Sequence, residues 1–184
     1  MKGLDAVTAD LVALFEGEGI VYALMGGLAV RIYALPRPTY DVDFTISLPR
    51  TELPRLYNLV KNLGYTVPAV QESGWVDTVK GLPVVKIQVI LGTGVIDVDA
   101  FLAETEYQHH LLTRRQRHRA DGLDAWFVSP EDLILLKLLA GRPKDRIDVG
   151  DIFLIQGQLD KAYLREWAGH LGVADVLTEI LGSP

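Results

Sequence analysis

Apolar residues recur along the N-terminal half of the chain with periods that alternate between helix and strand. Val7, Leu11 and Leu14 follow helical spacing, whereas residues 21–25 form a short apolar run. The helix after this run ends before Pro36, because the residue that precedes a proline disfavours helical conformation. The pattern predicts, in order, a helix over residues 4–16, a strand over 21–25, a helix over 27–35, a loop over 36–39, a strand over 41–46 and a helix over about 51–63.

Strand patterns dominate the middle of the chain, and helical patterns dominate its C-terminal third. Ser129 can cap a helix that has Pro130 at its first position and Asp132 in an approximate capping box. The other predicted elements are strands over 75–79, 83–90 and 95–101, a helical start within 104–120 that ends in a basic run, a strand over 125–128, and helices from 130 to the break at 142–143, over 145–155, over 160–169 and over 173–181. We therefore predict an α+β fold, with a mixed β-sheet flanked by helices over residues 1–128 and a helical region over 129–184 packed on it as one compact unit.

Composition narrows the class of protein. Of the 184 residues, 49% are hydrophobic and 23% are charged, as in an ordinary globular chain with one sizeable core. The absence of cysteine excludes disulfides, thiol catalysis and cysteine-based zinc sites. No apolar run approaches about eighteen residues and no basic-then-hydrophobic leader opens the chain, so we expect a cytoplasmic protein without a membrane span. A net charge of −6 argues against a generic nucleic-acid coat.

Two glycines and two carboxylates form the most informative motif. Thirteen residues separate Gly27 from Asp41 in the stretch that runs from Gly26-Gly27 to Asp41-Val42-Asp43. Side chains i and i+2 of a strand share a face, so Asp41 and Asp43 project together and repel each other unless a cation lies between them. Hard divalent ions such as Mg²⁺, or Mn²⁺, suit these oxygen ligands. Glycines also let backbone N–H groups approach a phosphate, so the motif predicts a site for a nucleoside triphosphate (NTP) and its metal.

A third acidic residue is expected on a neighbouring strand, because one pair of carboxylates does not usually hold the two cations of a two-metal site. The predicted strand over 95–101 carries Asp97 and Asp99, which share a face. A carboxylate within an apolar strand needs a metal, a partner or the protein edge. The residues alone leave Asp97 and Asp99 open as the third ligand.

Two segments resemble known nucleotidyltransferases. The string Gly26-Gly27-x13-Asp41-Val42-Asp43 resembles the signature of the DNA polymerase β nucleotidyltransferase superfamily, although Gly27 replaces a frequent serine, so a serine hydroxyl is missing. The stretch from Lys137 to Asp148 is similar to the Lys-x-x-Ala-x-x-x-(Lys/Arg)-Asp-x-x-Asp motif of the AbiEii-like nucleotidyltransferases of type IV toxin–antitoxin systems. The two matches lie in the expected order and together cover residues 20–152.

This resemblance implies a Pol β-like fold and Mg²⁺-dependent transfer of a nucleoside monophosphate (NMP) from an NTP such as ATP to a hydroxyl of an acceptor. It implies that Asp41, Asp43 and Asp99 are the catalytic metal ligands. Asp99 matches the family pattern better than Asp97, and would also help to deprotonate the acceptor. The residues that the resemblance assigns to nucleotide binding are Gly26, Gly27, Lys137, Arg142 and Lys144.

The charged residues of the second motif have alternative interpretations. Lys137 interrupts an apolar helix, so its ammonium must reach water or meet an anion. The resemblance places Lys137 on the triphosphate, and a structural ion pair is the alternative. Asp145 and Asp148 share a helix face and are expected to orient Lys137 or Arg142 instead of touching the metal. Arg37, on the loop before the carboxylates, either contacts a phosphate or lies on the surface.

Three functions follow from these observations. The resemblance implies a toxin-like enzyme that acts on RNA, in particular tRNA, with a cognate antitoxin or toxin protein as partner. A second hypothesis keeps the chemistry but has a small-molecule acceptor, as in aminoglycoside and lincosamide nucleotidyltransferases. A third is a catalytically silent, antitoxin-like module that binds nucleotide or a partner. RNA binding needs cationic side chains. The dense cationic cluster of the chain consists of Arg114, Arg115, Arg117, His118 and Arg119. This cluster is either a contact surface for a polyanion or a solvated helix end or loop.

Overall fold

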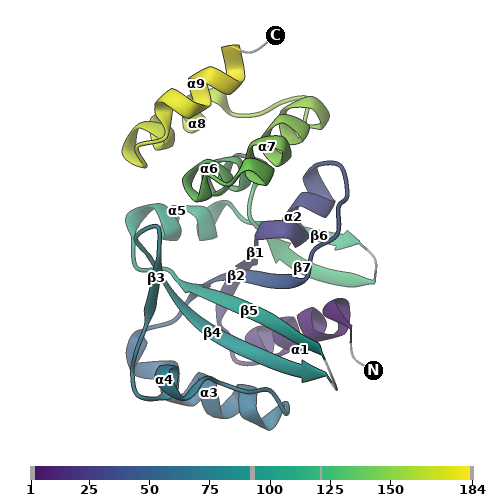
Figure 1. Ribbon diagram of the computed structural model, residues 1–184, viewed down its shortest axis with the longest axis vertical. Coiled ribbons are helices and arrows are strands. Elements are labelled where there is room, and N and C mark those ends of the chain that lie inside the picture. The colour runs from purple at the N-terminus through teal and green to yellow at the C-terminus, as the bar shows by residue number, and fades with distance from the viewer. Residues whose placement is uncertain (1–2, 92–93, 121, 183–184) are drawn as a thin grey trace.

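The computed structural model describes residues 3–91, 94–120 and 122–182, which form a mixed sheet flanked by helices (Figure 1). The strand order is β3-β4-β5-β2-β1-β7-β6. Strand β2 pairs in parallel with β5, and β1 with β7, whereas the other pairs are antiparallel. The strands are β1 Val21–Leu24, β2 Asp41–Ser47, β3 Asp77–Val79, β4 Leu82–Leu91, β5 Gly94–Leu102, β6 Gln116–Ala120 and β7 Leu123–Phe127.

Helices lie at both ends of the molecule and beside the sheet between them (Figure 1). Helices α6 to α9 gather beyond one end of the sheet, and α3 and α4 lie at the opposite end (Figure 1). Helix α2 contacts both α6 and α7. The helices are α1 Leu4–Gly17, α2 Gly26–Tyr33, α3 Leu53–Asn62, α4 Ala69–Glu72, α5 Glu106–Arg114, α6 Pro130–Ala140, α7 Pro143–Ile155, α8 Lys161–His170 and α9 Ala174–Gly182. The predicted α+β class, with its mixed sheet and helical C-terminal third, is confirmed.

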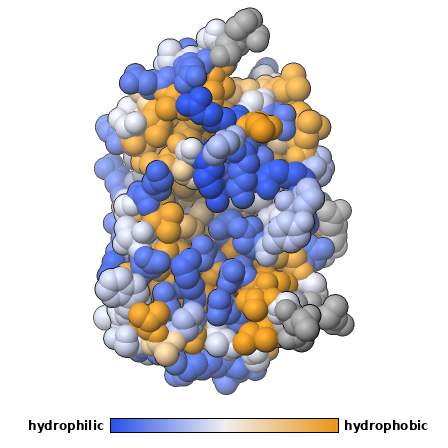
Figure 2. Space-filling model, viewed as in Figure 1, coloured by the Kyte–Doolittle hydropathy of each residue, from blue (hydrophilic) through white to orange (hydrophobic). Residues whose placement is uncertain are grey.

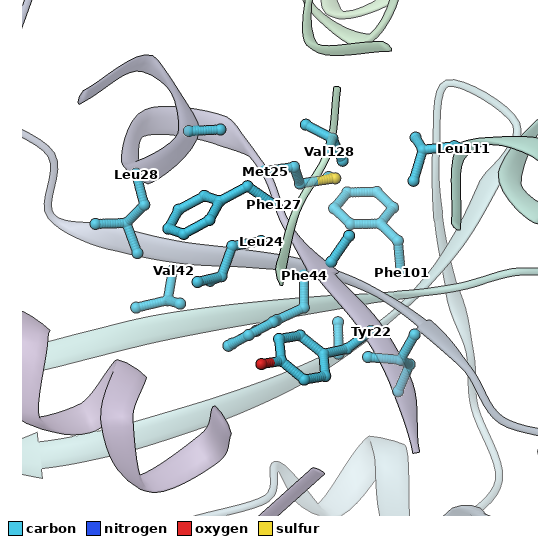
Figure 3. Close-up of a cluster of buried hydrophobic side chains, with 14 of the residues drawn as sticks. Tyr22, Leu24, Met25, Leu28, Val42, Phe44, Phe101, Leu111, Phe127 and Val128 are labelled. Carbon is cyan, nitrogen blue, oxygen red and sulfur yellow. The ribbon is translucent and has the colours of Figure 1, made fainter. Parts of the chain in front are cut away.

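Alternation along β2 separates the core from the other face of the sheet. Phe44 is fully buried, and its ring packs edge-on against Phe15 of α1 with 5.1 Å between centroids. The Tyr22 ring lies 6.0 Å from that of Phe44 within the same apolar cluster (Figure 3). Burying side chains of this size stabilises the fold by roughly 1.5–3 kcal/mol each. Because neighbours in a strand point to opposite faces, this anchoring of Phe44 turns Asp41 and Asp43 away from the core.

Most of the basic run forms a strand, so its interpretation as a helix end or loop holds only for Arg114 and Arg115. Helix α5 ends at Arg114, and residues 116–120 form the edge strand β6, which pairs with β7. Exposed Arg117 and Arg119 alternate with half-buried side chains. This period of two is that of a strand, but the consecutive cationic or polar residues Arg117, His118 and Arg119 obscure it.

Other boundaries differ by a few residues. Helix α4 is not predicted, β3 begins at Asp77 instead of residue 75, and α7 begins at Pro143 because proline suits the first position of a helix. Within the described ranges, no helix has both the length and the apolar character needed to cross a bilayer. The division at residue 128 stays a prediction, although every described element after β7 is a helix.

Candidate active site

The parallel register of β2 and β5 brings the predicted carboxylates together. Asp43 lies opposite Asp99, and Asp41 lies opposite Asp97, so all four share one face of the sheet. Asp41, Asp43 and Asp99 line a cavity of about 360 Å³, whose other residues come largely from α6 and the β3–β4 hairpin. Asp97 does not line this cavity, and its Oδ1 accepts a hydrogen bond of 2.9 Å from Nε2 of Gln88. The cavity therefore contains Asp99 and not its alternative.

Close packing at the start of α2 accounts for both glycines. Gly26 has a φ of +60°, and a Cβ at this position would come within 1.9 Å of Oδ2 of Asp43. A Cβ on Gly27 would lie 2.3 Å from Oγ1 of Thr39, whose hydroxyl donates a hydrogen bond of 2.8 Å to Oδ1 of Asp41. The glycines thus leave room for the groups that position the carboxylates. Gly26 lines the cavity, whereas Gly27 does not.

The carboxylates of the cavity repel one another. The pKa of Asp43 is raised to about 7, first by burial and then by the charges of Asp41 and Asp99. The positive charges of Lys137 and Arg142 act in the opposite direction and are too weak to restore an ordinary pKa. A further cation beside Asp43 would stabilise its ionised form, so the electrostatics of the cavity favour cation binding.

The oxygen atoms of Asp41 and Asp43 are the type of donor that fits a hard divalent cation. The predicted set of three ligands is nevertheless incomplete as the side chains lie, since within the described residues no group of three or more His, Cys, Asp or Glu side chains could hold a metal ion. Oδ1 of Asp99 instead accepts a hydrogen bond of 3.0 Å from Nζ of Lys86 on β4. A metal held by all three carboxylates therefore either takes Oδ1 of Asp99 from Lys86 or binds Asp99 through its second oxygen, Oδ2.

A network of ion pairs fixes the cations of the second motif. Lys137 on α6 is only 4% exposed, and its Nζ lies 3.0 Å from Asp145 and 2.7 Å from Asp148. Nε of Arg142 donates to Asp145 at 2.6 Å, and Arg37 donates two hydrogen bonds of 2.7 Å to Asp148. Burial opposes ionisation of these aspartates, but the hydrogen bonds from their cationic partners lower the pKa of both.

The predicted nucleotide-binding cations do not all reach the cavity. Lys137 and Arg142 line it while they keep their aspartate partners. Lys137 therefore makes structural ion pairs, as one interpretation of the sequence expects. It also lies in the cavity, where the other interpretation, contact with a triphosphate, requires it. Lys144 is exposed on α7 and does not line the cavity. Arg37 is tied to Asp148 across the fold and is not a free surface arginine.

The sequence motifs predicted neither the apolar half of the cavity nor the β3–β4 hairpin at its rim. Lys80 lines the cavity from the two-residue turn between β3 and β4, where it has a φ of +52°. Such turns favour asparagine or glycine, and the Lys80-Gly81 pair between two strand patterns was the available signal. The apolar lining residues are Met25, Val79, Leu82, Phe101, Leu133, Leu136, Leu139 and Ala140. Apolar groups mixed with a few charged ones are typical of small-ligand sites.

Solved structures of similar fold are nucleotidyltransferases or resemble them. An antigenic nucleotidyltransferase-like protein from Paracoccidioides brasiliensis is 22% identical with a TM-score of 0.57, over 97% of this chain and 91% of that one. The antibiotic-resistance factor ANT(2″)-Ia is 14% identical with a TM-score of 0.55, over 97% of each chain. The lincosamide antibiotic adenylyltransferase LnuA is 13% identical with a TM-score of 0.52, over 85% of this chain and all of the other. The chain thus has a nucleotidyltransferase fold.

Residues 2–177 match the family model described as "Nucleotidyltransferase of unknown function (DUF6036)", and the chain belongs to this family. No curated protein matches it in sequence. The predicted nucleotidyltransferase class is confirmed. The AbiEii-like subfamily, the toxin role, the cognate partner, Mg²⁺, ATP as donor and the cytoplasmic location stay predictions.

Proposed function

We propose that the protein transfers an NMP group from an NTP to a hydroxyl of an acceptor, with Mg²⁺ held by Asp41, Asp43 and Asp99. The observation that carries this proposal is the cavity, which those three carboxylates share with Lys137 and Arg142. Carboxylates are suited to hold the metal, and the two cations are suited to hold phosphates. The same lining therefore has ligands for both parts of a metal-bound triphosphate.

In the proposed reaction, the acceptor oxygen forms a bond to the α-phosphorus of the NTP. The bond from that phosphorus to the oxygen that bridges to the β-phosphate breaks, and pyrophosphate leaves with the bonding electrons. Asp99 takes the proton of the hydroxyl, in the role of general base. Lys137 and Arg142 neutralise charge on the phosphate oxygens. Mg²⁺, when bound, supplies further charge stabilisation to these oxygens.

Asp99→Asn will lower NMP transfer by about a thousandfold, because one substitution removes a metal ligand and the proton acceptor. Asp97→Asn is the matched control two residues away on the same face, and it will lower transfer by less than about tenfold. The assay incubates purified protein with each α-labelled NTP, Mg²⁺, and either total RNA or a panel of small hydroxyl compounds. A larger loss with Asp97→Asn would make that residue the third carboxylate. Absence of label transfer and of pyrophosphate release with every NTP would refute the proposed reaction.

The state of the arginine cluster supports a small-molecule acceptor. Arg117 and Arg119 both pair with Asp124 at 2.7 Å, and Arg114 pairs with Glu131 at 3.2 Å. Strand β6 lies three strand positions from β2, or about 14 Å at the usual strand spacing. Arg117 and Arg119 on β6 are thus paired with an acid and distant from the carboxylates of β2. Two proteins of similar fold were solved with small molecules, LnuA with lincomycin and ANT(2″)-Ia with adenylyl-2″-tobramycin.

RNA in a toxin-like role, with a cognate antitoxin, is the second candidate, and the motif from Lys137 to Asp148 favours it. The two acceptors predict different behaviour for a variant with Arg117 and Arg119 replaced by serine. With a small-molecule acceptor, transfer will stay within about twofold of wild type, since these side chains are remote and exposed pairs contribute little stability. An RNA acceptor predicts weaker RNA binding with a flatter dependence on salt, because fewer counterions are released. Filter binding of RNA at several salt concentrations decides between them.

A further inference from the structure

Lys86 occupies an unusual place beside the third carboxylate. Strand register places Lys86 of β4 opposite Asp99 of β5, and Asp99 opposite Asp43 of β2, so the three side chains form one row across the sheet. Nζ of Lys86 donates to Oδ1 of Asp99 at 3.0 Å. The lysine therefore holds one of the oxygen atoms that a metal ion would need.

Asp99 differs in this respect from the other acids of the same face. Asp41 accepts a hydrogen bond from a threonine hydroxyl, and Asp97 accepts one from the neutral amide of Gln88. Across the described residues, Asp99 alone of the four acids is in an ion pair. The pair is partly open to water, with side-chain exposures of 41% for Lys86 and 27% for Asp99. Solvent weakens such a pair, so fold stability is a poor explanation for it and exchange with another cation is feasible.

We propose that Lys86 is the resident counter-ion of Asp99, which a divalent cation must displace before this carboxylate becomes a ligand. This inference rests on the proposed function, in which Asp41, Asp43 and Asp99 bind the metal. In the free protein, a cation already holds Oδ1 of Asp99, whereas Asp41 and Asp43 are in no ion pair among the described residues. Lys86 thereby lowers the affinity of the protein for metal ions and limits the repulsion between Asp43 and Asp99 when no metal is bound. Lys86 is a positioning residue, because it acts through Asp99.

The test measures Mn²⁺ binding without nucleotide, by the electron paramagnetic resonance signal of the free ion. We expect Lys86→Met to lower the Kd for Mn²⁺ by about tenfold or more, because Asp99 loses its competing cation. Lys86→Arg keeps the charge and will stay within about threefold of wild type. Lys80→Met removes a lysine that lines the cavity around Asp99. The hydrogen bond to Oδ1 of Asp99 comes from Lys86 and not from Lys80, so this variant reports the effect of charge alone.

A double-mutant cycle with Asp99→Asn isolates the contact. The gain in affinity from Lys86→Met will vanish in the Asp99→Asn background if Lys86 acts through Asp99. Unchanged or weaker Mn²⁺ binding by Lys86→Met overturns the inference. A gain in Mn²⁺ affinity of equal size when Lys86→Met is made in the Asp99→Asn background also overturns it, and so does an equal gain from Lys80→Met. Lys86→Gln serves the same comparison if thermal unfolding shows that the methionine variant is not folded. Absence of Mn²⁺ binding by every variant and by wild type, with and without NTP, would instead refute the metal site of the proposed function, and this inference with it.

Discussion

Replacing Asp41 and Asp43 together with alanine will reduce NMP transfer at least about a thousandfold and abolish Mg²⁺-dependent NTP binding. Metal stabilisation of a transition state contributes several kcal/mol, and each 1.4 kcal/mol is about a factor of ten in rate. Both carboxylates line the cavity, and both are assigned to the metal in the proposed function. Isothermal titration of NTP with and without Mg²⁺, together with the label-transfer assay, measures the effect. Wild-type affinity for NTP and Mg²⁺ in the double variant would contradict the assignment.

The pH dependence of stability shows whether the double alanine variant is folded. In wild type, the pKa of Asp43 is raised to about 7, so between about pH 4 and pH 7 the folded protein holds a proton that the unfolded chain has released. Wild-type stability without metal therefore falls as the pH rises through this interval, by up to about 4 kcal/mol for a shift of about three pH units. The double variant lacks this slope and will exceed wild type in stability at pH 8 but not at pH 5. Denaturant titrations in a chelating buffer at both pH values test this sign.

Lys137→Met will destabilise the fold by about 3 kcal/mol or more, because removing one partner of a buried ion pair leaves uncompensated charge. Asp145 and Asp148 are buried and lie 3.0 and 2.7 Å from this ammonium, and only Arg142 and Arg37 remain to neutralise them. The variant will also bind NTP more weakly. Lys137 and Arg142 are the two cavity residues to which we assign phosphate binding, and the variant lacks one of them.

Lys144→Met is the matched control for stability, because Lys144 is an exposed lysine on the adjacent helix α7. Its free energy of unfolding will stay within about 0.5 kcal/mol of wild type, as for most surface substitutions. Denaturant unfolding monitored by tryptophan fluorescence measures both variants. A Lys137→Met protein with wild-type stability would show that the ion pairs do not support the fold, and normal NTP affinity in that variant would remove Lys137 from the proposed binding site.

Tertiary structure changed the interpretation of several charged residues, and the reason is the same in each case. Arg37 and Asp148 are 111 residues apart and meet only because α7 packs near the loop before β2. Sequence periodicity identifies the face on which a side chain lies, but not the residue of another element that meets it. Lys137 illustrates this point. Its apolar helix left two possibilities, that the ammonium reaches water or meets an anion, and the packing of α6 against α7 brings Asp145 and Asp148 to it.

The sequence by itself determined the class of fold and the shared face of Asp41 and Asp43, because these depend on short-range periodicity. The nucleotidyltransferase class came from the resemblance of two sequence motifs to known families. Only the tertiary structure decided between Asp97 and Asp99 as a cavity residue, since both share a face and the difference lies in their register with β2 and β4. The same register brought Lys86 to Asp99, a contact that no local pattern predicts. Strand pairing, which is a property of distant segments, therefore decided which carboxylates line the cavity and which cation pairs with Asp99.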